Sequence, residues 1–303
     1  MRLASITCLA LAVFVGAQSV APGPAGLFEL AQALLFAGRP AEASPLFEKA
    51  VALQPKVAAY HLWLARSYAA EAKRTSNVMR LVSIGWNCGD ELEAAVSLDP
   101  ASLEARLDLV RYYVTAPALV GGSWSKARAQ AAEIAKRDAA LGAFADGYVA
   151  YRRKEYGVGR TRFRNAVRLA VARETKVLAL TWLGYLSQET QQYDDAFGAF
   201  DEILRIDPAH AHALYEVGRT ALFSGRDLDR GEASLKRYLT TTPRYDEPSI
   251  ADAHLQLGLL LERKGDTEAA RREVEAALRL DPEVEGGRAA EQRFGVRQPK
   301  LPL

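Results

Sequence analysis

A short phrase returns four times along this chain, each time as an apolar stretch that closes on Pro. It reads Ala-Val-Ala-Leu-Gln-Pro at 50–55, Ala-Val-Ser-Leu-Asp-Pro at 95–100, Ile-Leu-Arg-Ile-Asp-Pro at 203–208 and Ala-Leu-Arg-Leu-Asp-Pro at 277–282. Pro is common just past a helix end, because it cannot continue the helix. Helix ends that recur at multiples of one repeat length predict an all-α solenoid of stacked helix pairs, since one pair cannot bury its apolar face alone.

Four landmarks per repeat extend this pattern to seven antiparallel helix pairs. They are a small residue midway along the first helix, a small residue early in the second, a bulky apolar residue one turn later, and the closing Pro. The pattern is irregular where Pro is missing, at Ala139 and Val171, and where the segments 71–87 and 116–123 are lengthened. We expect a linker at 18–23, a repeat domain at 24–283, and a C-terminal cap and tail at 284–303. The predicted pairs are 24–57, 58–102, 103–139, 140–174, 177–210, 211–245 and 251–284.

These landmarks resemble the tetratricopeptide repeat family over nearly all of residues 24–283. The family motif places an apolar residue and Gly or Ala in the first helix, and Ala, Phe or Tyr, Ala and Pro through the second. The resemblance implies a right-handed superhelical solenoid whose first helices line a concave groove, and a non-enzymatic scaffold that binds a protein or peptide partner there. The best matches are Leu183, Gly184, Ala196, Phe200 and Pro208 in the fifth pair and Leu257, Gly258, Ala270, Ala277 and Pro282 in the seventh.

The groove-facing side of the first helices is rich in aromatic residues and Arg, which are enriched at binding hot spots. The same aromatic residues could instead fill space between neighbouring pairs, as most aromatic residues in helices do. The Lys and Asn of the family's carboxylate clamp are absent, because those positions hold Gln, Arg and Tyr. The predicted partner-binding residues are Trp63, Arg66, Arg111, Tyr148, Tyr151, Arg152, Trp182, Tyr185, His212, Tyr215 and Arg219.

Residues 83–127 carry a second, shorter resemblance. The run Ser-Ile-Gly-Trp-Asn-Cys-Gly-Asp at 83–90, followed by Ala-Pro at 116–117 and Gly-Gly-Ser at 121–123, is similar to the T component of tripartite periplasmic transporters. That resemblance implies an alternative function, as a periplasmic accessory of a solute transporter or a small-ligand-binding repeat protein. A structural explanation is also open, in which an extended helix and a Gly-rich turn lengthen two repeats.

The first residues are typical of an export signal. Arg2 precedes an apolar run over 3–15, and small residues end at Ala17, so we expect cleavage before Gln18 and a periplasmic or secreted protein. A retained anchor is the alternative, although the run is shorter than the ~20 residues of a spanning helix. No later segment is apolar enough to span a membrane. Removal of residues 1–17 leaves Cys88 as the only cysteine, which excludes an internal disulfide.

Several function classes find no support in the sequence. Lys and Arg total 39 against 37 Asp and Glu, so the strong positive field of a nucleic-acid binder is missing. His210 and His212 lack further ligands for a metal site, and no nucleophile triad, phosphate loop or dinucleotide fingerprint occurs. We therefore expect no enzyme activity, cofactor or metal, and Cys88 to be a packing residue. The oligomeric state is not fixed by the sequence.

Overall fold

The structure is a computed structural model that describes residues 22–244 and 247–295. The predicted signal peptide lies outside these residues. Within them the chain forms fifteen α-helices and one 3₁₀ helix, η1 (Ala118–Val120), and no strand. The first helices of the pairs are α1 (Pro24–Phe36), α3 (Ala58–Ala72), α5 (Leu103–Thr115), α7 (Ala139–Arg152), α9 (Arg173–Glu189), α11 (Ala211–Ser224) and α13 (Ile250–Arg263). The second helices are α2 (Pro40–Leu53), α4 (Val78–Leu98), α6 (Trp124–Ala135), α8 (Tyr156–Leu169), α10 (Tyr193–Ile206), α12 (Leu228–Tyr238) and α14 (Thr267–Leu280).

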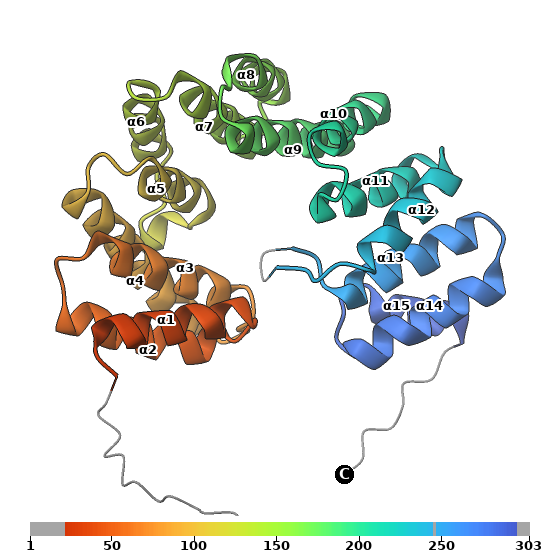
Figure 1. Ribbon diagram of the computed structural model, residues 1–303, viewed down its shortest axis with the longest axis horizontal. Coiled ribbons are helices and arrows are strands. Elements are labelled where there is room, and N and C mark those ends of the chain that lie inside the picture. The colour runs from red at the N-terminus through yellow and green to blue at the C-terminus, as the bar shows by residue number, and fades with distance from the viewer. Residues whose placement is uncertain (1–21, 245–246, 296–303) are drawn as a thin grey trace, which may run out of the picture.

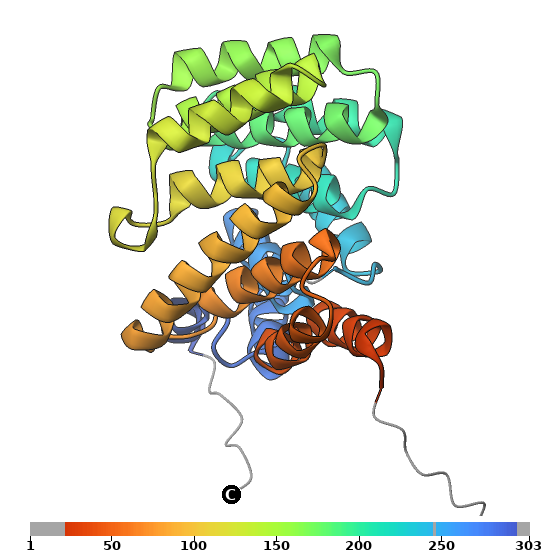
Figure 2. The same cartoon turned by 90° about the vertical axis from the view of Figure 1, so that its left-hand side faces the viewer.

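The seven pairs form the expected right-handed solenoid, bent into an open arch. Figure 1 shows α5, α9 and α11 on the inner side of this arch and α6, α8 and α10 outside them. In the side view, the helices of the second to fifth pairs lie in successive layers, from orange at the bottom to green at the top (Figure 2). The concave side of the arch therefore belongs to the first helices.

Small residues bring the two helices of a pair into close contact. A Cβ atom added to Gly184 would stand 2.4 Å from the ring of Phe200, and one added to Gly218 would stand 2.3 Å from Leu235. Both distances are far inside van der Waals contact, so only glycine allows these bulky side chains to cross the first helix. The small and bulky landmarks of the repeat are thus two halves of one packing contact.

The recurring Asp-Pro ending has a local explanation. The side chains of Asp99, Asp207 and Asp281 each accept a hydrogen bond from the backbone N–H two residues further on, at 3.1, 3.1 and 2.9 Å. This arrangement is the turn that Asp forms with its own backbone after a helix. The Pro between the two bonded residues has no N–H that needs a hydrogen-bond partner. Asp and Pro together therefore end the helix and turn the chain.

The two lengthened segments pack on each other. The extra residues of the second pair extend α4 to 21 residues, and those of the third pair form η1 and a Gly-rich turn. The hydroxyl of Tyr112 donates to the carbonyl oxygens of Gly85 on α4 and Val120 in η1, and Trp86 Nε1 donates to the oxygen of Leu119 at 3.0 Å. The extended helix and Gly-rich turn considered from the sequence are therefore what the structure contains.

The last pair is followed by a short helix, α15 (Gly287–Phe294), which packs on α14. Its Ala290 is buried with Leu255 and Leu278 in a small apolar cluster. Among the described residues, no helix has the length and apolar character needed to cross a membrane.

Candidate functional site on the concave face

A cavity of about 770 Å³ opens on the concave side of the first three pairs. Its walls come from α1, α3 and α5, with contributions from α4 and from the loop between α12 and α13, which Figure 1 shows reaching across the inside of the arch. Cavities of this size accommodate small molecules or a few residues of a peptide. The lining residues that matter below are Phe36, Trp63, Arg66, Lys73, Arg74, Glu104, Asp108, Arg111 and Arg244.

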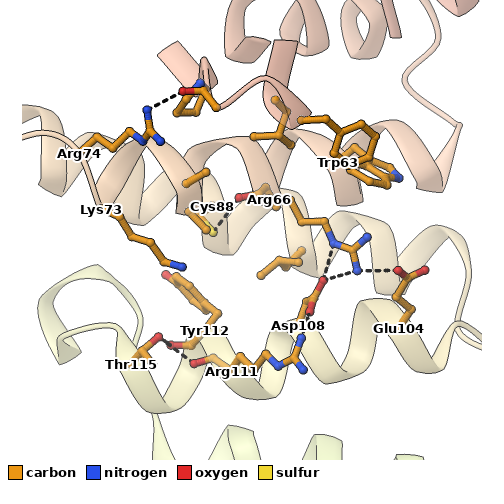
Figure 3. A pocket seen from close by; sticks show the side chains of 18 of the residues that line it. Trp63, Arg66, Lys73, Arg74, Cys88, Glu104, Asp108, Arg111, Tyr112 and Thr115 are labelled. Atoms are coloured by element: carbon orange, nitrogen blue, oxygen red, sulfur yellow. Dashed lines mark hydrogen bonds and ion pairs between the residues drawn. The ribbon is translucent and has the colours of Figure 1, made fainter. Parts of the chain in front are cut away.

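An ion-pair network joins α3 to α5 inside this cavity (Figure 3). Arg66 Nε donates to Asp108 Oδ2 at 2.7 Å, and its Nη2 lies 2.6 Å from Glu104 Oε1. Arg111 Nη1 donates to the other Asp108 oxygen at 2.9 Å. Burial opposes the charge of Arg66, but the carboxylates of Asp108 and Glu104 outweigh it and raise the pKa of Arg66. Both acidic side chains of the cavity are thus held by arginines.

The apolar wall of the cavity is aromatic. The rings of Phe36 and Trp63 meet edge to face with centroids 5.5 Å apart, and the guanidinium of Arg66 lies 5.0 Å from the Trp63 ring. Phe36 is 51% exposed and Trp63 is half-buried. Such rings offer apolar area at low conformational cost to a partner side chain.

The concave face of the fourth, fifth and sixth pairs is filled by aromatic rings that contact each other. The Trp182 ring lies 4.6 Å from that of Tyr148 and 5.4 Å from those of Tyr151 and Tyr185. The hydroxyl of Tyr185 and Nε2 of His212 share a hydrogen bond. We call Tyr148, Tyr151, Trp182, Tyr185 and His212 the aromatic ladder.

Beyond the ladder, a buried carboxylate organises the sixth pair. Glu216 is 1% exposed, and it accepts hydrogen bonds from Gln188 Nε2 at 2.9 Å and Arg219 Nη1 at 3.0 Å. A buried charge is costly unless it is paired and hydrogen-bonded. Arg219 is thereby held in place beside Glu216 on α11.

Comparison with known proteins identifies the repeat. One tetratricopeptide repeat family model matches residues 24–67, and a second matches residues 181–246 and 215–285. The chain is a tetratricopeptide repeat protein. Proteins of this family and fold are typically scaffolds that bind protein or peptide partners. None of the curated proteins matches this tetratricopeptide repeat protein.

Three solved structures show the same fold. Human IFIT1, a dimer with PPP-AAAA, is 16% identical with a TM-score of 0.64, and the match covers 90% of this chain and 63% of that one. Yeast Tom70 is 15% identical with a TM-score of 0.61, and the match covers 93% and 58%. A tetratricopeptide repeat protein of Parabacteroides merdae is 14% identical with a TM-score of 0.52, and the match covers 90% and 98%. At these identities the likeness concerns the fold alone.

The structure distributes the eleven predicted groove residues of this tetratricopeptide repeat protein over distinct environments. Trp63, Arg66 and Arg111 line the cavity. Tyr148 and Tyr215 are only 4% and 6% exposed, so little of either ring is available to a partner. Arg152 is exposed. The other five residues are half-buried: Tyr151, Trp182, Tyr185, His212 and Arg219.

Sequence reasoning missed several cavity residues of the tetratricopeptide repeat protein. Asp108 could have been found, because it stands two residues before the small-residue position Val110, as Trp63 stands two before Ala65. Lys73, Arg74 and Arg244 could not, since they lie outside the regular helices where the repeat register does not apply.

The remaining reactive side chains of the tetratricopeptide repeat protein have structural roles. Cys88 is buried against the oxygen of Ala65, and burial raises the pKa of its thiol to about 12. His210 caps α11 by accepting from the N–H of Ala213, which explains one histidine of the pair. Within residues 22–244 and 247–295 there is no group of three or more His, Cys, Asp or Glu side chains that could hold a metal ion.

Proposed function

We propose that this protein is a non-enzymatic scaffold of the cell envelope or secreted space that binds a segment of a partner protein in its concave groove. The observation that carries the proposal is the cavity on α1, α3 and α5, which combines exposed aromatic area with positioned arginines. Binding sites of this composition gain affinity from the rings and orientation from the planar guanidinium groups.

Site-specific crosslinking tests the groove. A photoreactive amino acid placed at Thr115, an exposed residue of the cavity, is expected to capture a partner protein from envelope extract. The same group placed at Val158, which is exposed on the outer helix α8, serves as the control. Equal capture from both positions, or capture from the outer position only, would refute the groove assignment.

The export part of the proposal rests on the first seventeen residues, which lie outside the described part of the chain. Mass spectrometry of the protein purified from its native envelope is expected to find Gln18 as the first residue. A protein that keeps Met1 or begins elsewhere would contradict cleavage at this site.

A second candidate is the accessory or small-ligand function, which the size of the cavity favours because sites for small molecules span ~300–1,000 Å³. A thermal-shift screen against organic acids and amino acids tests it. A bound solute at 100 times its dissociation constant should stabilise the protein by about 2.7 kcal/mol. No shift with any solute would leave the peptide scaffold as the better description.

A further inference from the structure

The charges of the cavity point to a particular partner chemistry. We propose that the cavity on α1, α3 and α5 selects an acidic peptide segment, in which a carboxylate side chain lies within a few residues of an aromatic or large aliphatic one. This inference rests on the proposed function, because it names what the groove binds.

The first step is a charge balance. The cavity is lined by five basic side chains and two acidic ones. Both carboxylates are already occupied, since Asp108 is held by Arg66 and Arg111, and Glu104 by Arg66. The chain as a whole has a formal charge of only +2, so this local excess is a property of the cavity rather than of the surface in general.

The second step concerns Lys73 and Arg74, at the end of α3. Among the residues that the structure describes, no carboxylate forms an ion pair with either side chain; Arg74 Nη1 donates to the carbonyl oxygen of Gly38 at 2.5 Å. Figure 3 shows the Lys73 ammonium directed toward the space between α3 and α5. Charge-assisted hydrogen bonds to a carboxylate are about twice as strong as neutral ones. Lys73 and Arg74 are therefore the side chains of the cavity best suited to bind an acidic side chain.

The third step concerns the apolar wall. Phe36 and Trp63 border the same cavity as Lys73, so a ligand that satisfies both must carry apolar area next to its negative charge. A simple inorganic anion has no apolar area to place against these rings. A nucleic-acid backbone, with a charge on every phosphate, would approach Glu104, whose carboxylate is largely exposed at the edge of the network. A peptide with one or two carboxylates avoids that repulsion.

Selection from a displayed library of random twelve-residue peptides tests the inference with the whole protein. We expect the wild type to enrich peptides with Asp or Glu close to Phe, Trp, Tyr or Leu. The double variant Lys73→Glu/Arg74→Glu should bind the selected peptide at least tenfold more weakly, measured by fluorescence anisotropy. The matched control Arg128→Glu/Arg162→Glu changes the net charge equally at two exposed positions outside the cavity, and should stay within twofold of the wild type.

The outcomes separate this inference from the proposed function. Enrichment of neutral or basic peptides in the groove would overturn acid selectivity and leave the scaffold intact, and so would equal losses in the two double variants. If no peptide is enriched and no partner is captured from Thr115, both proposals fail. Circular dichroism shows whether the glutamate variants fold; if they do not, Lys73→Gln/Arg74→Gln replaces them, and binding within twofold of the wild type by that variant would also overturn the inference.

Discussion

The two halves of the concave face both carry a tryptophan at the same repeat position, but its surroundings differ between them. Trp63 and Trp182 each stand two residues before the small residue of their helix, Ala65 and Gly184. Trp182 is surrounded by the rings of three tyrosines, whereas Trp63 borders an open cavity. The register of the repeat thus decides which side chains reach the groove, and the neighbouring pairs decide whether those side chains pack or remain available.

The matched tryptophans give the sharpest test of this contrast. Trp182→Ala should lower the free energy of unfolding by about 3 kcal/mol, because the three tyrosine rings lose their common neighbour. Trp63→Ala should cost about half as much, since its ring lines the cavity and has two phenylalanine rings as aromatic neighbours in place of three tyrosine rings. Urea unfolding followed by circular dichroism measures both.

Peptide affinity should reverse that order. Trp63→Ala should weaken binding of the peptide selected by the wild type about tenfold. Trp182→Ala should leave the affinity for this peptide within twofold of the wild type, at a temperature where the variant is folded. Equal effects of the two substitutions on stability and on affinity would erase the distinction between the halves.

A second prediction concerns the turn that is specific to the third pair. A Cβ at Gly122 would lie 1.9 Å from the carbonyl oxygen of Ala116, which is backbone and cannot move aside as a side chain could. Gly122→Ala should therefore destabilise the protein by about 2 kcal/mol. Gly157→Ala, in α8 where nothing lies within 4 Å, should instead stabilise it by about 0.5 kcal/mol. Two losses of similar size would show that the clearance around the glycine is not the cause.

Salt should change peptide affinity less than the loss of Trp63 does. Raising the ionic strength from about 0.05 to 0.5 M should weaken binding of the acidic peptide about fivefold. The reason is that salt screens the attraction between exposed charges such as Lys73 and the peptide carboxylate. The stability of the aromatic ladder should change little, since its contacts are mainly between rings. Affinity independent of salt would argue that apolar contacts alone hold the peptide.

Much of the architecture could be predicted from the sequence because it follows from local rules. The Gly184 and Phe200 landmarks are one steric contact, and the Asp207-Pro208 ending is one hydrogen-bonded turn, so each is visible within a single repeat. The cavity could not be predicted in this way. Its shape depends on how far α1, α3 and α5 spread apart, and Arg244 joins it from the opposite end of the chain.

The position of α15 has a consequence for how binding and unfolding are coupled. The last pair is covered by this helix, and the first pair has no counterpart among the described residues. In a linear array each pair is held mainly by its neighbours, so removal of α15 would let the last pair fray and its amide protons exchange faster. The cavity lies at the opposite end of the array, where Phe36 and Trp63 of the first two pairs line it. A segment that bridges α1, α3 and α5 would join the first three pairs to one another, and because it binds only their folded form it would stabilise them against unfolding.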